Sequence, residues 1–247
     1  PSLIYASLEG PNSLSIGAVE GVLPADNVST LQVKATVKDQ FGNPVNDGTR
    51  VYFTSELGSM MAGQPTSSSS TTGGVAVSTL TAPDWGTIRF GSVESAKRGI
   101  SKVTVTAGDV DGVPMAVNDI CRVIFTGTPK TFYITMNELG IPATATTIRA
   151  GNTISFYSYA KDEYDHPLAP STRENPSYAT VNFLPGGERS SFSPTAVTHN
   201  PAGIATAQFS ASTRTIDSPA AVTARMRCMG YIYYAENTVI TTIMPEK

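Results

Sequence analysis

Apolar and polar residues alternate along this chain with a period of two. In LQVKATVKD, residues 31–39, four apolar side chains occupy every second position and polar ones lie between them. Successive side chains of a β-strand point to opposite faces of the sheet. The pattern therefore predicts a strand with one buried and one solvated face.

The same alternation recurs in both halves of the chain. It predicts further strands at 49–56, 74–82, 86–93, 101–108 and 119–127, and then at 131–136, 152–162, 179–187, 203–212, 220–230 and 231–243. Clusters of Gly, Pro, Ser and Asn separate these segments, and no stretch has a helical period long enough to compete. About seven short strands in each half predict an all-β chain of two antiparallel, Greek-key β-sandwiches.

The two halves also resemble each other. KDQFGNP at 38–44 aligns with KDEYDHP at 161–167, and GVAVSTLTA at 74–82 aligns with GIATAQFSA at 203–211. A repeat of about 120 residues indicates an internal duplication. We expect residues 1–8 to be a linker from a preceding region, 9–127 to be the first domain and 128–247 the second. The short connection, which contains Pro129, predicts two domains set end to end as a segment of a rod.

Three features resemble the bacterial immunoglobulin-like domains of group 1, which build the stalks of invasin and intimin. They are the strand ending in KDQFGNPV, the GVAVSTLTA strand after a Ser/Thr-rich loop, and the KVTVTAG strand followed by a terminal VIFTG. The second half matches less closely, because Asp165 and His166 stand where the first half has Gly42 and Asn43. Two segments are longer than the family pattern, 83–101 and 171–179, and either could carry what is particular to this protein.

The resemblance implies two tandem immunoglobulin-like sandwiches in a non-catalytic stalk or adhesion segment of a larger protein. Such a protein would be extracellular, on the surface of a Gram-negative bacterium, and anchored in the outer membrane through regions outside this segment. Its partners would be a protein or carbohydrate on a host or bacterial cell, and neighbouring repeats of the same chain. Two alternatives stay open: a surface protein for contact between bacteria, as in plasmid conjugation or aggregation, and an accessory module of a secreted enzyme.

Composition argues against nucleic acid and membrane as partners of this segment. Charged residues make up 15% of the chain and the net charge is -3, with Lys and Arg scattered, so the basic patch of a nucleic-acid binder is missing. No apolar run approaches the roughly 18 residues that span a bilayer, so we expect no direct membrane insertion by this segment. The first residues, PSLIYASLEG, lack the pattern of a signal peptide, and we expect the chain to be a segment of something longer.

Two cysteines, Cys121 and Cys228, lie in alternating runs, each on the face that carries the apolar residues. A buried free thiol is the expected state of each, and a bridge between the halves is the alternative in an oxidising compartment. No Cys/His cluster with the spacing of a zinc site occurs.

Other candidates for chemistry have simpler structural explanations. His166 and His199 occupy turn sequences, Asp109 and Asp111 in GDVDG form a hairpin signal, and the serines at 67–70 are typical of a mobile polar loop. The acidic stretches around Asp39 and Asp162 fit a corner whose carboxylate accepts hydrogen bonds from turn amides. We therefore expect no catalytic residue, no cofactor and no metal site, and no enzymatic activity.

Tyrosine is the residue whose distribution favours binding. Eight of the ten tyrosines fall in the second half. In NTISFYSYA the apolar positions turn Tyr157 and Tyr159 outward, and Tyr231 and Tyr233 lie in a second tyrosine-rich run. These four are the candidate partner-binding residues, because tyrosine buries a large area at low entropic cost. The alternative is that they cover neighbouring strands, which tyrosine also favours.

Overall fold

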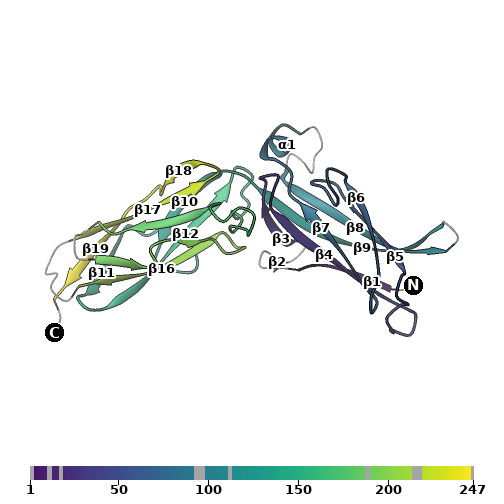
Figure 1. The fold of residues 1–247 in the computed structure, drawn as a ribbon. Coiled ribbons are helices and arrows are strands. Elements are labelled where there is room, and N and C mark those ends of the chain that lie inside the picture. The colour runs from purple at the N-terminus through teal and green to yellow at the C-terminus, as the bar shows by residue number, and fades with distance from the viewer. Residues whose placement is uncertain are drawn as a thin grey trace. The chain divides into compact units, whose positions relative to one another are not determined.

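The chain divides into two compact units. The computed structural model describes residues 3–9, 13–16, 19–91, 98–110, 113–186, 190–212 and 219–245. One unit comprises Pro1–Thr126 with Thr172–Asn175, and the other comprises Gly127–Ser171 with Pro176–Lys247. Each unit consists of two layers of β-sheet (Figure 1).

The first unit is formed by nine strands and one short helix among the described residues. They are β1 (Leu3–Glu9), β2 (Ser13–Ile16), β3 (Val19–Pro24), β4 (Thr30–Lys38), β5 (Arg50–Ser55), β6 (Thr66–Ser70), β7 (Val75–Thr81), α1 (Trp85–Phe90), β8 (Ile100–Val110) and β9 (Val113–Thr126). One sheet has the order β1-β4-β7 and the other β2-β3-β9-β8-β5-β6.

The second unit repeats this plan. Its described strands are β10 (Pro129–Thr135), β11 (Ala145–Arg149), β12 (Thr153–Asp162), β13 (Thr180–Leu184), β14 (Ser190–Ser193), β15 (Val197–Thr198), β16 (Ile204–Ala211), β17 (Ala220–Cys228), β18 (Tyr231–Tyr234) and β19 (Val239–Met244). One sheet has the order β10-β12-β16-β14 and the other β11-β19-β17-β13-β15, with β18 paired to β17.

This topology is that of an immunoglobulin-like sandwich. With β10, β12, β13, β14, β16, β17 and β19 lettered A to G, the second unit has A-B-E-D in one sheet and G-F-C in the other, which is the immunoglobulin arrangement. The predicted all-β, immunoglobulin-like fold is confirmed. Antiparallel pairing was expected throughout, but among the described strands one pair in each unit is parallel, β3 with β9 and β11 with β19.

Alternation along the strands supplies the core of each unit. In β4 the buried residues are the four at odd positions from Leu31 to Val37, as the sequence pattern predicted. In the second unit Phe156, Phe192 and Phe209 contact one another, with ring centroids 5.2 to 5.8 Å apart. Edge-on packing of such rings adds to the burial of their large apolar area.

One predicted strand, 86–93, is wrong. Residues Trp85–Phe90 form the helix α1, which begins at Asp84. The Asp84 carboxylate accepts a hydrogen bond from the Thr87 amide at 3.0 Å and so satisfies one of the amides that a helix start leaves free. Only Ile88 of this helix is buried. The alternation of apolar and polar residues in GTIRF therefore did not indicate a strand with one buried face. Residues 92–97 of the longer segment 83–101 lie outside the described residues.

Two further expectations of unpaired chain are corrected. The serine tract, expected as a mobile loop, belongs to β6, which pairs with β5 from Arg50↔Ser70 to Thr54↔Thr66. Residues 3–8, expected as part of a linker, belong to β1 (Leu3–Glu9), which pairs with β4. Backbone hydrogen bonds hold both strands at a sheet edge, where an apolar face is not required.

The stretch 231–243, predicted as one strand, is two strands separated by four residues. β18 ends at Tyr234 and pairs with the end of β17, whereas β19 begins at Val239 and pairs with its start. Both cysteines are buried and neither forms a disulfide, as expected from the faces on which they lie.

Candidate functional site

The corner that follows β4 is organised by the carboxylate of Asp39. Its Oδ1 accepts hydrogen bonds from the backbone amides of Phe41 at 2.8 Å and Asn43 at 2.9 Å. These bonds, that from Asn43 most of all, hold the pKa of Asp39 below its ordinary value, because hydrogen bonds to the ionised form favour it. Gly42 follows the turn with a φ of +84°, where glycine has no Cβ to clash.

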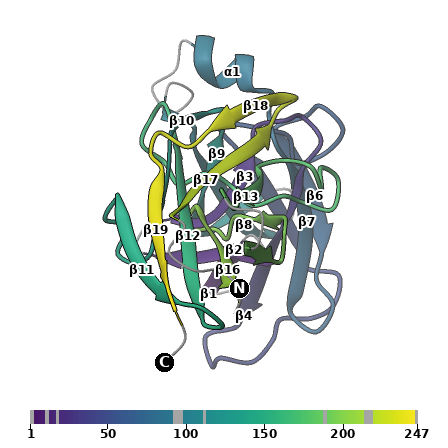
Figure 2. The same cartoon turned by 90° about the vertical axis from the view of Figure 1, so that its left-hand side faces the viewer.

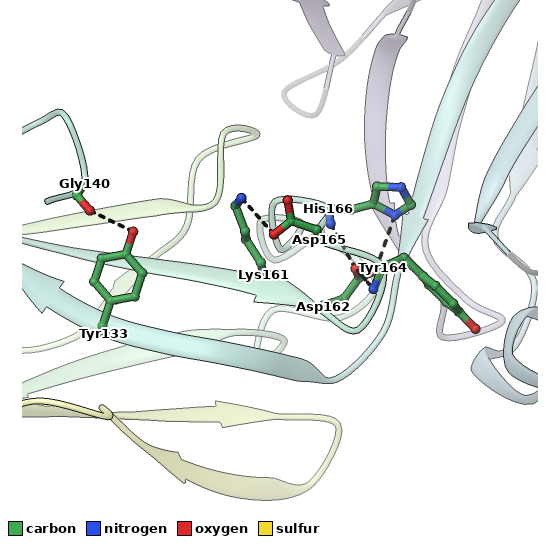
Figure 3. Close-up of polar contacts among 7 residues, drawn as sticks. All are labelled: Tyr133, Gly140, Lys161, Asp162, Tyr164, Asp165 and His166. Atoms are coloured by element: carbon green, nitrogen blue, oxygen red, sulfur yellow. Dashed lines mark hydrogen bonds and ion pairs between the residues drawn. The ribbon is translucent and has the colours of Figure 1, made fainter. Parts of the chain in front are cut away.

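The corner that follows β12 repeats these contacts (Figure 3). Asp162 Oδ1 accepts hydrogen bonds from the amides of Tyr164 at 2.9 Å and His166 at 3.0 Å. Asp165 occupies the left-handed position with a φ of +66°, and its carboxylate lies 2.9 Å from the Lys161 ammonium. The expectation that both aspartates accept hydrogen bonds from turn amides is confirmed.

A glycine packs against each corner in the same way. Gly74 and Gly203 have φ values of +77° and +72°. A Cβ on Gly74 would lie 2.7 Å from Pro44 Cβ, and one on Gly203 would lie 3.0 Å from Pro167 Cβ and 2.7 Å from the carbonyl oxygen of Ala160. Real Cβ atoms do not approach other atoms so closely. Gly74 and Gly203 therefore pack directly against the prolines of the two corners.

The two histidines differ in their surroundings. His166 Nδ1 lies 3.6 Å from Asp162 Oδ2, which is too long for a hydrogen bond. His199 was expected in a turn, but its side chain is buried, 2% exposed. Its Nδ1 lies 3.1 Å from the carbonyl oxygen of Ala179, and burial lowers the pKa of the ring to about 4. A general base must reach solvent or substrate, and His199 does not.

Tyr157 and Tyr159 point away from the core, and their hydroxyls hold a loop of the same unit. Tyr159 donates to the carbonyl oxygen of Glu138 and stacks on Tyr133, with ring centroids 5.6 Å apart. Tyr133 donates to the carbonyl oxygen of Gly140 at 2.9 Å (Figure 3), and Tyr157 donates to Glu138 Oε1 at 3.1 Å. The pKa of Tyr159 is raised, chiefly by burial and then by Tyr133. Partner binding by these tyrosines stays a prediction.

The loop that these hydroxyls hold presents two apolar side chains. Asn137 Oδ1 accepts hydrogen bonds from the amides of Leu139 at 3.1 Å and Ile141 at 3.2 Å. Leu139 is 83% exposed and Ile141 60%. The hydrogen bonds fix the backbone of the loop, so the two side chains are displayed on an ordered support.

The other two candidate tyrosines lie on β18, beside β17 (Figure 2). Tyr231 is 68% exposed, and Tyr233 is half-buried, with a pKa raised chiefly by burial. Tyr178 of the longer segment 171–179 is buried, and its hydroxyl donates to the carbonyl oxygen of Gly127 at 2.7 Å. Of these two side chains, Tyr231 is accessible to a partner and Tyr178 is not.

Sequence reasoning missed a set of residues on the outward face of β13, β17 and β18. Arg225 and Arg227 are exposed and lie on either side of buried Met226. Their cross-strand neighbours complete what we call the arginine face, namely Thr180, Asn182, Arg225, Arg227, Ile232 and Tyr234. A pocket of about 290 Å³ lies there, lined by Asn182, Arg225, Met226, Arg227, Gly230 and Ile232. The signal was present, because RMRC alternates charged and apolar residues, but only its apolar positions were interpreted.

The described residues also bear on the expectations of a metal site, a hairpin and a membrane span. The described part of the chain has no group of three or more His, Cys, Asp or Glu side chains placed to hold a metal ion. Val110 and Val113 pair at the ends of β8 and β9, while Asp111 of the GDVDG signal lies outside the described residues. No helix in the described ranges is both long and apolar enough to cross a membrane.

No protein-family model matches the chain, and no curated protein matches it. Solved structures that are similar include the Yersinia pseudotuberculosis adhesin InvE, with 16% identity and a TM-score of 0.33 over 96% of this chain and 58% of that one. InvD of the same bacterium has 18% identity and a TM-score of 0.39 over 91% and 55%. A fragment of intimin in complex with the intimin-binding domain of its translocated receptor has 14% identity and a TM-score of 0.36 over 100% and 65%.

The chain covers 58% and 55% of the two Yersinia chains, and so less than two thirds of either. At such identities and TM-scores these likenesses carry no argument about function or partner. The immunoglobulin-like fold rests instead on the order of strands within each unit.

Proposed function

We propose that the chain is a non-catalytic stalk and adhesion segment of a larger bacterial surface protein of the invasin and intimin type. The protein would stand outside a Gram-negative cell and would be anchored in the outer membrane through regions outside this segment. Its partner would be a protein or a carbohydrate on a host or bacterial cell, and other repeats of the same chain would adjoin it.

One observation carries this proposal, the repetition of the same corner in both units. Asp39 and Asp162 accept equivalent amide hydrogen bonds. Gly74 and Gly203 pack in equivalent positions against the proline of each corner. The residues that form the first corner, KDQFGNP, are also those that resemble the group 1 bacterial immunoglobulin-like domains. A duplicated domain with a two-residue connection between β9 and β10 suits a chain that adds length by repetition.

The corners also explain residues that would otherwise suggest chemistry. The carboxylates of Asp39 and Asp162 accept hydrogen bonds from backbone amides. The buried ring of His199 faces the carbonyl oxygen of Ala179. These contacts support a structural role for the residues that a catalytic hypothesis would need. They favour a structural role over a catalytic one for these residues.

The test is to locate the segment on living cells and then remove it. An antibody raised against the 247-residue chain should label intact bacteria that express the full-length protein, and external protease should abolish the labelling. In-frame deletion of the segment, with flanking regions kept, should reduce attachment to host cells while an unrelated surface marker stays unchanged.

Each other outcome points elsewhere. Labelling only after the cells are opened would refute the surface location. Surface labelling with normal host attachment but fewer mating pairs or aggregates would replace the host-adhesion role by contact between bacteria. Loss of a secreted hydrolytic activity on deletion would show an accessory module instead of a stalk.

A further inference from the structure

The arginine face concentrates positive charge on one patch of sheet. Arg225 and Arg227 are two residues apart on β17, so their side chains leave the same face with Cα atoms roughly 7 Å apart. Both side chains are exposed, and neither makes a side-chain hydrogen bond or ion pair within the described part of the chain. Two like charges at this spacing repel each other, and an anion between them would relieve the repulsion.

Uncharged groups flank the two guanidinium groups in a definite order. Asn182 and Tyr234 lie opposite Arg225 on its two neighbouring strands, and Ile232 lies opposite Arg227 on β18. Ile232 is 57% exposed and Tyr234 is 65% exposed. The face thus combines a carboxylate-binding pair with an amide that can bind a hydroxyl and with apolar surface that can cover a ring.

The pocket on this face limits the size of what it holds. Its volume of about 290 Å³ is at the lower end of the range for ligand sites, roughly 300 to 1,000 Å³. A group of that size is a single ring with its substituents. A stable protein interface would instead bury roughly 800 Å² on each partner, which a single pocket of this size does not define.

We infer that the arginine face binds a sugar residue that bears a carboxylate, such as a sialic or uronic acid. The carboxylate lies between Arg225 and Arg227, whose planar guanidinium groups match its two oxygens. Asn182 binds ring hydroxyls, and Ile232 and Tyr234 cover the apolar face of the ring. This inference names the partner for the proposed adhesion function and rests on it only for where the sugar is met, on the surface of another cell.

Titration of the 247-residue chain with free sugars tests the site directly. N-acetylneuraminic acid and glucuronic acid are added to isotope-labelled protein, and the neutral sugars N-acetylglucosamine and glucose serve as controls. Saturable changes in amide chemical shifts are expected along β13, β17 and β18 with the two acidic sugars only. The double variant Arg225→Gln with Arg227→Gln should weaken binding at least roughly tenfold, as loss of charged hydrogen bonds does.

Arg149→Gln is the matched control, because Arg149 is an exposed strand arginine of the same unit, outside the arginine face. It removes the same kind of charge and should leave binding unchanged. All variants alter exposed side chains, and an unchanged thermal midpoint would show that each remains folded.

Several results would overturn the inference. Equal binding of the neutral sugars would remove the role of the carboxylate, and equal weakening by Arg149→Gln would reduce the effect to general charge. Binding of a glutamate-rich peptide at the arginine face without binding of either acidic sugar would replace the sugar by a protein partner. Failure of every sugar to bind would refute the site but leave the stalk proposal intact, since surface labelling tests that separately.

Discussion

Acid should destabilise the second unit through His199. Burial lowers the pKa of this imidazole from 6.5 to about 4, because the charged ring loses its hydration. The carbonyl oxygen of Ala179, 3.1 Å away, can only accept a hydrogen bond, so Nδ1 carries the proton of the neutral ring. The fold therefore holds the neutral form, whereas the unfolded chain protonates at the ordinary pKa.

The sign and size of the effect follow from this difference. Between pH 6.5 and about pH 4 the unfolded chain binds a proton that the folded chain does not. The neutral ring of His199 therefore contributes its full stabilisation above pH 6.5, and this stabilisation is lost as the pH falls towards 4. At about 1.4 kcal/mol for each pH unit, the loss amounts to roughly 3 kcal/mol. Below pH 4 this residue causes no further loss.

The measurement is urea unfolding at about pH 7.5 and pH 4, comparing the natural chain with His199→Asn. Asparagine places an amide donor near the position of Nδ1 and does not titrate in this range. Methyl resonances of buried residues report the second unit. Fluorescence of Trp85, the single tryptophan, reports the first unit and serves as an internal control.

Acid should reduce the free energy of unfolding of the natural second unit by roughly 3 kcal/mol more than that of the variant. The carboxylates titrate in both proteins, so the difference between their acid-induced losses of unfolding free energy isolates the contribution of His199. An identical loss in both would refute the reasoning, and it would mean that His199 is protonated in the folded state or already shielded in the unfolded state.

Three further outcomes follow from the packing of single residues. Burial raises the pKa of the Cys228 thiol to about 12, and Cys121 is also buried. Both thiols should therefore resist a disulfide-exchange reagent at pH 8 until urea unfolds the chain. Fast reaction of the folded protein would contradict this. Asp162→Ala should lower the free energy of unfolding of the second unit by about 1 to 3 kcal/mol, because it strands two amides at a buried position. Asp39→Ala, at an exposed equivalent corner, should have the smaller effect in urea unfolding, and equal effects would refute the role of burial. Gly203→Ala should lower the thermal midpoint of the second unit, since its Cβ would lie 2.7 Å from a carbonyl oxygen at a positive φ; an unchanged midpoint in calorimetry would show that the corner yields.

Strands were predictable where one face enters a core, and β4 is an example. Its four buried residues from Leu31 to Val37 alternate with exposed or half-exposed polar ones, so a period of two was visible. β6 could not be found in this way. Its serines bury little surface, and the strand exists through the backbone hydrogen bonds of β5, which side-chain alternation does not reveal.

The helix α1 and the strand β1 show two other limits. GTIRF alternates well enough to resemble a strand, but the Asp84 carboxylate caps the segment as a helix that buries only Ile88. β1 begins within a few residues of the first position of the chain and pairs with β4 at long range. A pairing between distant segments leaves little trace in the local sequence.

The candidate site was predictable only in part. The outward position of Tyr157 and Tyr159 followed from the buried position of Phe156. The hydrogen bonds of their hydroxyls to Glu138 did not, because they depend on how a loop returns over the sheet. The pairing of Arg225 with Tyr234 likewise depends on a hairpin register that the predicted single strand at 231–243 concealed.

The parallel pairing within each unit has a mechanical consequence. In the second unit β11 pairs with β19 over five residue pairs from Ala145↔Ile240 to Arg149↔Met244, and β11 lies near the start of the unit and β19 near its end. Tension applied to the two ends pulls parallel neighbours in opposite directions along their length. All the hydrogen bonds of the ladder are then sheared together, whereas a ladder peeled from one end breaks them one at a time. In the second unit β10 precedes β11 and meets the tension first, and the β11–β19 ladder then resists it through all five residue pairs at once.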